Sequence, residues 1–133
     1  MTTERMERTA EEWGRVAVSL PGWRWMPGMR TIYDIIILDV YPESGSETGV
    51  FASRGGTVIV AGFEDEDVPD ADDPGTAGCL LALLGSSVMS VEPADDGGWL
   101  VELYDLGEHH GSSLGRACIA AAAALGRWPG GEG

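Results

Sequence analysis

Residues 73–85 read DPGTAGCLLALLG and carry the start signal, the apolar run and the stop signal of a core helix. Aspartate is favoured as a helix N-cap, and proline suits the first helical position because no amide hydrogen is needed there. The run from Cys79 to Leu84 is apolar on every side, and Gly85 is a natural stop. The pattern predicts a helix over 74–84 that is buried in the core.

The segment directly before this helix is strongly acidic. Residues 64–73, EDEDVPDADD, hold seven acids in ten positions. Repulsion at this density opposes both helix and strand, so the sequence predicts a loop. An EF-hand is not expected, because a loop that starts at Asp65 or at Asp70 has Thr76 or Leu81, and no glutamate, at its twelfth position. We interpret Asp65, Asp67, Asp70 and Asp72 as candidate partner-binding carboxylates, with a merely solvated charge run as the alternative.

Apolar and β-branched stretches on both sides predict strands. The Ile-Ile-Ile-Leu run within Ile32–Tyr41 suggests a central strand that is covered on both faces. Residues 108–111 are expected to form a loop, and residues 113–127 a last, alanine-rich helix. The predicted strands are 31–41, 49–53, 57–63, 88–92 and 98–104.

A first helix is predicted over residues 3–19. Its apolar residues recur at steps of three and four, and Thr2 or Thr3 can cap it. The element order is then α-β-β-β-α-β-β-α. We therefore expect one α+β domain over residues 1–133, with three helices and an antiparallel or mixed sheet of about five strands. Its core should include Ile36, Leu38, Leu80, Val60, Leu84 and Ile119.

Residues 21–30, PGWRWMPGMR, form a loop between two Pro-Gly turn signals. Trp23, Arg24, Trp25, Met26 and Arg30 could stack on a base or grip a protein partner. The competing interpretation is that the tryptophan pair covers the core beneath the first helix. We carry both interpretations forward.

Charge narrows the possible partners. The chain has 133 residues, eight arginines, no lysine and a formal charge of −14. Residues 64–133 hold fourteen acids and two arginines, a net of −12. Such a surface repels nucleic acid and anionic membranes and attracts basic surfaces. Without an apolar membrane span or a signal peptide pattern, we expect a cytoplasmic protein with Cys79 and Cys118 reduced and buried.

No motif predicts catalysis. The sequence has no GxSxG, Walker-type or dinucleotide glycine pattern. His109 and His110 are adjacent, and side chains of adjacent residues diverge, which disfavours a shared metal. We therefore predict no catalytic residue, no metal site and no cofactor.

Several motifs together resemble a known family. WRWMPGM at 23–29, DPGTAGCLLALL at 73–84 and Gly97-Gly98-Trp99 before an alanine-rich helix are similar to small phage and prophage proteins with a WxWxPGM loop and a DPxTxGCLLxL helix. The resemblance implies an accessory protein of tailed phages, and it carries no assigned function or catalytic residues. This chain departs from the pattern at Gly75 and in its acidic run.

These observations lead to two function hypotheses from different classes. The first is a non-enzymatic phage protein that binds a basic surface on a host protein or complex, as an anti-CRISPR-like inhibitor of host defence would. The alternative is a protein that binds or sequesters a nucleotide signal between the tryptophan loop and Arg24, Arg30 or Arg54. A phosphate binder should bring arginines together in one pocket, whereas an inhibitor of the first kind should show a continuous acidic face.

Overall fold

The computed structural model describes residues 8–42, 48–54, 57–62 and 67–131, and it describes side chains for residues 8–38 and 67–130. The chain is α+β. Its elements are α1 (Ala10–Ser19), β1 (Ile36–Pro42), β2 (Thr48–Arg54), β3 (Thr57–Gly62), α2 (Pro74–Leu84), β4 (Val88–Pro93), β5 (Trp99–Leu103), β6 (Gly107–Gly111) and α3 (Leu114–Leu125).

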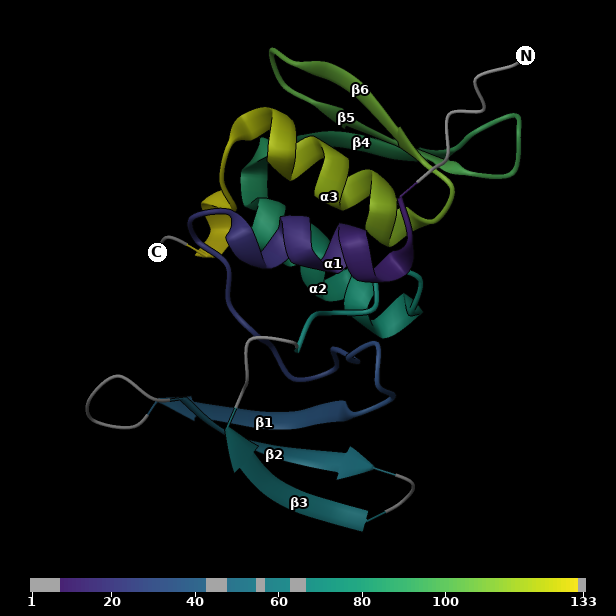
Figure 1. Cartoon of the computed structure of the whole chain (residues 1–133). Helices are drawn as coiled ribbons and strands as arrows, with labels where there is room; N and C mark the ends of the chain where they lie inside the picture. Colours follow the sequence, from purple (N-terminus) through teal and green to yellow (C-terminus); the bar gives the residue numbers. More distant parts are fainter. Residues whose placement is uncertain (1–7, 43–47, 55–56, 63–66, 132–133) are drawn as a thin grey trace.

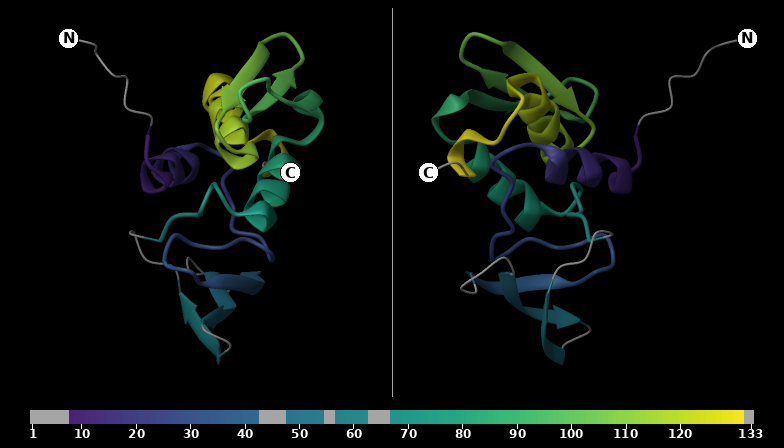
Figure 2. Two further views of the ribbon diagram at one scale, coloured as in Figure 1. Left: turned by 90° about the vertical axis from the view of Figure 1, so that its right-hand side faces the viewer. Right: turned by 60° about the vertical axis from the view of Figure 1, so that its left-hand side comes forward.

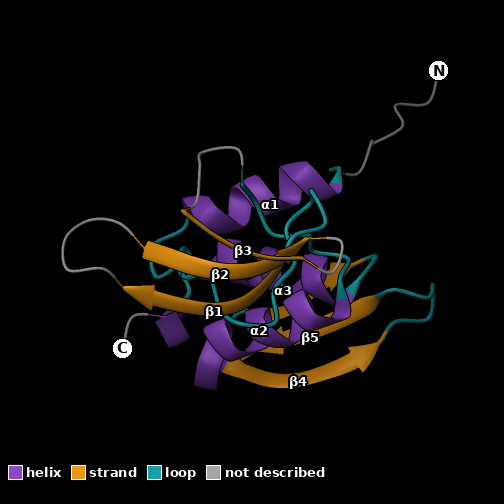
Figure 3. Ribbon diagram, turned by 90° about the horizontal axis from the view of Figure 1, so that it is seen from below, coloured by secondary structure: helices purple, strands orange, loops and turns teal. Residues whose placement is uncertain are grey.

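The strands form two separate antiparallel sheets, ordered β1-β2-β3 and β4-β5-β6. The three helices lie between the sheets, with α3 directly against the second one (Figure 1). Two further views show the same separation (Figure 2), and the view from below shows β1–β3 in front of the helices (Figure 3). The expectation of a single sheet of about five strands is therefore wrong, although three helices are present.

Strand β6 was not anticipated, because residues 108–111 were expected to form a loop. The segment has almost no apolar side chain, so its pairing with β5 comes from tertiary contact and not from a local pattern. Gly111 faces α3, and a Cβ atom there would overlap the backbone of Ala117. The absence of a side chain at Gly111 thus lets strand and helix approach closely.

Helix α2 matches its prediction from end to end. Asp73 accepts a hydrogen bond from the Thr76 amide at 2.9 Å, and Pro74 occupies the first helical position. Gly85 ends the helix with a φ of 63°, a value that favours glycine. Leu80 and Leu84 are fully buried, so this helix does form part of the core.

Helix α1 begins later than predicted. Thr9 and Glu12 form a reciprocal capping box, with bonds of 3.1 Å and 2.8 Å between side chains and backbone amides. Thr9 therefore caps the helix, and the expectation of Thr2 or Thr3 as the cap is wrong. The part of the prediction that covers residues 3–7 lies outside the described residues.

The core prediction is confirmed on the helices and fails on β1. Ile119 is fully buried, as are Leu80 and Leu84, but Leu38 is 45 % exposed and Ile36 is half-buried. Strand β1 lies at the edge of its sheet, and its register with β2 shifts between Ile37 and Asp39. Ile37 therefore takes the buried position. The side chain of Val60 lies outside the described residues.

Both cysteines are unpaired, as predicted. Cys118 is fully buried, and burial raises the pKa of its thiol to about 12. Cys79 is only half-buried, and its Sγ donates to the Pro27 carbonyl oxygen at 3.4 Å. Burial, together with the charge of Asp73, raises the pKa of the Cys79 thiol. None of the described helices has the length and apolar character of a membrane span.

Candidate binding surfaces

The tryptophan loop packs into the protein. Trp23 meets Trp25 edge-on at 5.4 Å between ring centroids, and it lies 6.0 Å from the ring of Trp128. Trp128 is fully buried, and its Nε1 donates to the Ala17 carbonyl oxygen at 2.9 Å. Trp23 and Trp25 are both half-buried in this cluster. This geometry corresponds to the interpretation of the loop as a cover for the core.

The end of the loop pairs with strand β1. The Gly28 amide donates to the Ile37 carbonyl at 2.9 Å, and the Ile37 amide donates to the Met29 carbonyl at 2.8 Å. Met29 is fully buried, and its sulfur accepts from the Met26 amide at 3.3 Å. The loop thus joins the first sheet to the helical core, a role that its sequence did not reveal.

Arg30 is held by internal partners. Its guanidinium forms ion pairs with Asp34 and, at 3.2 Å, with Asp73. Its amide donates to Thr76 Oγ1 at 2.9 Å. Arg24 is exposed on the same loop, and the side chain of Arg54 lies outside the described residues. The arginines of the nucleotide hypothesis therefore do not converge in the part of the chain whose side chains are described.

Residues 67–73, the acidic segment, are clamped onto the fold and do not extend into solvent. Val68, Pro69 and Ala71 are buried. The Ile32 amide donates to the Val68 carbonyl at 3.1 Å, and an isolated antiparallel β-bridge pairs Pro69 of the segment with Thr31. A Cβ atom on Gly14 of α1 would lie 2.7 Å from the Pro69 carbonyl oxygen, so α1 packs directly on the segment.

The carboxylates of the acidic segment have internal partners. Asp72 accepts two bonds of 2.8 Å from Arg116, which lower the pKa of Asp72 below its ordinary value. Asp70 Oδ1 accepts from the Asp72 amide at 3.0 Å. Asp67 is half-buried, and Asp65 lies outside the described residues. Asp70, Asp72 and Asp73 therefore do not form a merely solvated charge run, which was the alternative interpretation of this segment.

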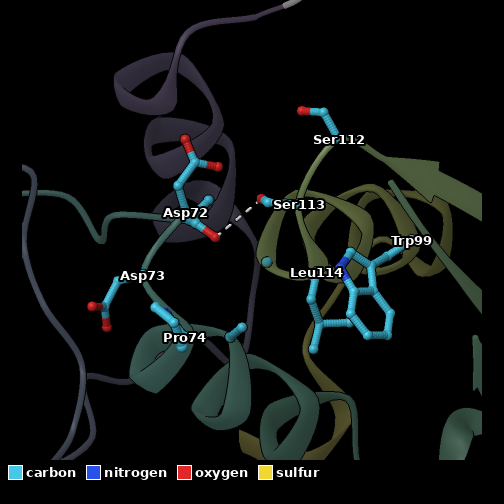
Figure 4. Close-up of a pocket in the computed structure, with 10 residues that line it drawn as sticks. Asp72, Asp73, Pro74, Trp99, Ser112, Ser113 and Leu114 are labelled. Carbon is cyan, nitrogen blue, oxygen red and sulfur yellow. Dashed lines mark hydrogen bonds between the residues drawn. The ribbon is translucent and has the colours of Figure 1, made fainter. Parts of the chain in front are cut away.

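A hollow of about 310 Å³ lies between the first turns of α2 and α3. Trp99 and Leu114 line one side and Pro74 the other, while the carboxylate of Asp73 turns away from it (Figure 4). Ser113 caps α3 and donates to the Ala71 carbonyl at 3.3 Å, so its hydroxyl is already engaged. None of the described arginines lines the hollow, whereas Asp72 and Asp73 do, so its lining offers a phosphate group no cationic side chain.

The second sheet has one buried face and one uncovered face. Val101 and Leu103 are buried beneath α3, so Leu100 and Glu102 point outward. Glu102 pairs with Ser90 and Glu108, and Leu100 pairs with Glu92 and His110. We call the outward-facing acids and those of the adjoining turns the acidic face; they are Glu92, Asp95, Asp96, Glu102, Asp105 and Glu108.

The acidic face contains a pairing that costs stability. Glu102 and Glu108 lie directly opposite each other on β5 and β6, and like charges in this position are destabilising. Every acid of the face except Glu102 is exposed. No arginine or lysine occurs between Arg54 and Arg116. These acids were not among the predicted site residues, because they are spread over residues 92–108 and form no run in the sequence.

The two histidines diverge, as expected for adjacent strand residues. His110 Nε2 lies 3.0 Å from Asp96 on the exposed side. The Gly98 amide, and after it His110, lower the pKa of Asp96. His109 pairs with Val101 on the buried side, where its Nε2 has no hydrogen-bond partner. Within the described residues, no three His, Cys, Asp or Glu side chains are placed to share a metal ion.

Comparison with known proteins found no matching family model, no matching curated protein and no matching solved structure.

Proposed function

We propose that this chain is a non-enzymatic accessory protein of a tailed phage that acts in the host cytosol by binding a basic surface on a host protein or complex. The surface we propose is the groove that a host defence complex uses to hold nucleic acid, so occupying it would inhibit that complex. The phage context rests on the motif resemblance. The binding mode rests on the charge and exposure of the acidic face.

The observation that carries this proposal is the uncovered side of the second sheet. All of its acids except Glu102 are exposed, no arginine or lysine occurs in the sequence between Arg54 and Arg116, and Glu102 faces Glu108 at a cost in stability. A basic partner would remove this repulsion on binding. It would also be attracted over a distance, because steering between opposite charges raises association rates.

The nucleotide hypothesis is the weaker of the two. It needs several arginines around one cavity, yet Arg30 pairs with Asp34 and Asp73, and Arg116 pairs with Asp72. The tryptophans that were to stack on a base instead pack against each other and against Trp128.

A charge-matched pair of variants tests the proposal. The face variant carries Glu92→Gln, Asp105→Asn and Glu108→Gln. The control carries Glu11→Gln, Glu43→Gln and Glu47→Gln. Each variant therefore lacks three of the negative charges that give the wild type its formal charge of −14. Each protein is immobilised and exposed to host lysate at low and at high salt, and both bound proteins and bound nucleotides are identified.

We expect a protein with a basic surface to be retained by the wild type and the control and lost by the face variant. The amount retained by the wild type should fall as salt is raised, because exposed charges are screened. Equal retention by the face variant would contradict the proposal. A nucleotide eluting in stoichiometric amount from the wild type would favour the alternative.

A further inference from the structure

We propose that one end of the second sheet is the anchor of the docking surface, and that it receives an arginine-bearing segment of a protein. The anchor consists of Met89, Tyr104 and Leu106, which we call the apolar end. This inference rests on the proposed function, since it names where and how the basic partner is gripped.

The three side chains are among the most exposed large apolar residues of the described chain. Tyr104 is 57 % exposed, and Met89 and Leu106 are each 46 % exposed. They come from the beginning of β4 and from the turn between β5 and β6. These meet because Val88 pairs with Leu103 and the Tyr104 amide donates to the Ser87 carbonyl at 3.1 Å. Exposed apolar side chains gathered in this way are typical of interaction sites.

The fold itself gives no reason for apolar residues at these positions. Leu103 already fills the core position at the end of β5, with 1 % exposure. Met89 lies where the register between β4 and β5 shifts, between Val88 and Ser90, so it has no partner on β5 that would place it on the buried face. Polar residues would satisfy the same backbone, and they would avoid exposing apolar surface to water.

Charge identifies the occupant. Glu102, Asp105 and Glu108 stand beside the apolar end, and no arginine or lysine lies between Arg54 and Arg116. An arginine side chain can stack on a tyrosine ring while its guanidinium donates two hydrogen bonds to one carboxylate. Nucleic acid is repelled by this surface, and so is a second copy of a chain with a charge of −14. A small cation would leave the apolar contacts unused.

The test uses three fluorescent probes of equal length: a twelve-residue peptide of alternating arginine and leucine, one of alternating arginine and serine, and a single-stranded DNA. Binding is measured by anisotropy at low and moderate salt. The test variant is Met89→Ser with Tyr104→Ser. The matched control is Leu38→Ser with Tyr33→Ser, because these residues are 45 % and 47 % exposed on a different part of the molecule. Thermal unfolding shows that each variant is folded.

We expect the arginine–leucine peptide to bind the wild type about tenfold more tightly than the arginine–serine peptide. The test variant should lose that advantage and the control should keep it. Equal binding of the two peptides, an unaffected test variant or tight binding of DNA would overturn this inference. If neither peptide binds at low salt, the proposed function itself fails. If the face variant weakens both peptides while the test variant weakens neither, only the anchor is wrong.

Discussion

The acidic segment and the acidic face carry the same kind of charge and use it in opposite ways. In the acidic segment, Asp72 is clamped by Arg116, and Asp73 caps α2 and pairs with Arg30. On the acidic face, Glu92 and Glu108 project from an uncovered sheet with no arginine nearby in the sequence. The density of charge along a sequence therefore does not measure how much charge is available to a partner. What matters is whether the fold supplies the counter-charge.

The largest effect that would separate the two regions is expected at Gly115. A Cβ atom at this position would overlap the Ala71 carbonyl oxygen, so Gly115→Ala should force the acidic segment away from α3. We expect the free energy of unfolding to fall by about 3 kcal/mol, which urea denaturation can measure. Gly78→Ala is the control, because nothing lies within 4 Å of its Cβ position; it should add about 1 kcal/mol. Similar results for the two variants would show that the segment is not clamped there.

A smaller loss of unfolding free energy is expected when the ion pair between Asp72 and Arg116 is weakened. Asp72→Asn removes the charge from two bonds to Arg116, whose side chain is only 14 % exposed. Because Asp72 is 43 % exposed, solvent screens part of this interaction, and we expect a loss of about 1 kcal/mol. Asp105→Asn on the acidic face should change stability by less than about 0.5 kcal/mol, since asparagine tolerates the φ of 71° found there.

The same clamp predicts a dependence on pH. The pKa of Asp72 is lowered in the folded protein from an ordinary value of 3.8, so folding favours its charged form. Its contribution is complete above pH 3.8 and is lost as the pH falls through the folded pKa. The loss of unfolding free energy on acidification should therefore be smaller in Asp72→Asn than in the wild type. Parallel curves for the two proteins would exclude Asp72 as a contributor.

The smallest expected change in unfolding free energy is a gain, and it concerns the acidic face. Glu108→Gln removes the repulsion with Glu102 across the two strands. We expect stability to rise by about 0.5 kcal/mol at low salt and by less at high salt. Glu92→Gln provides the comparison, because Glu92 faces the neutral Leu100. A stability loss in Glu108→Gln would show that the face is tuned for folding and not for a partner.

Features set by local chemistry were predictable, and features set by distant pairing were not. Both ends of helix α2 were predicted correctly, because Asp73, Pro74 and Gly85 start and stop the helix through contacts with residues only a few positions away. The division into two sheets depends on which strands meet, and Leu38 sits on an exposed edge although its sequence neighbourhood resembles a central strand.

The acidic face escaped prediction for the same reason. Glu92, Glu102 and Glu108 are separated in sequence, and they come onto one face only when β5 pairs with β4 on one side and with β6 on the other. Strand β6 has no apolar alternation to announce it, since its inward positions are taken by His109 and Gly111. The alternation of Val101 and Leu103 with Leu100 and Glu102 was the one local sign that this sheet has an outer side.

The contact of Trp128 with the first helix has a consequence for synthesis of the chain. Its indole donates to the carbonyl of Ala17, 111 residues earlier, and its amide donates to Pro21 at 2.8 Å. Helix α1 and the tryptophan loop emerge from the ribosome before Trp128 does, and they cannot reach their final packing until Trp128 has been translated. Until then the nascent chain presents Trp13, Trp23 and Trp25 without their full native cover, and chaperones bind exposed apolar surface of this kind.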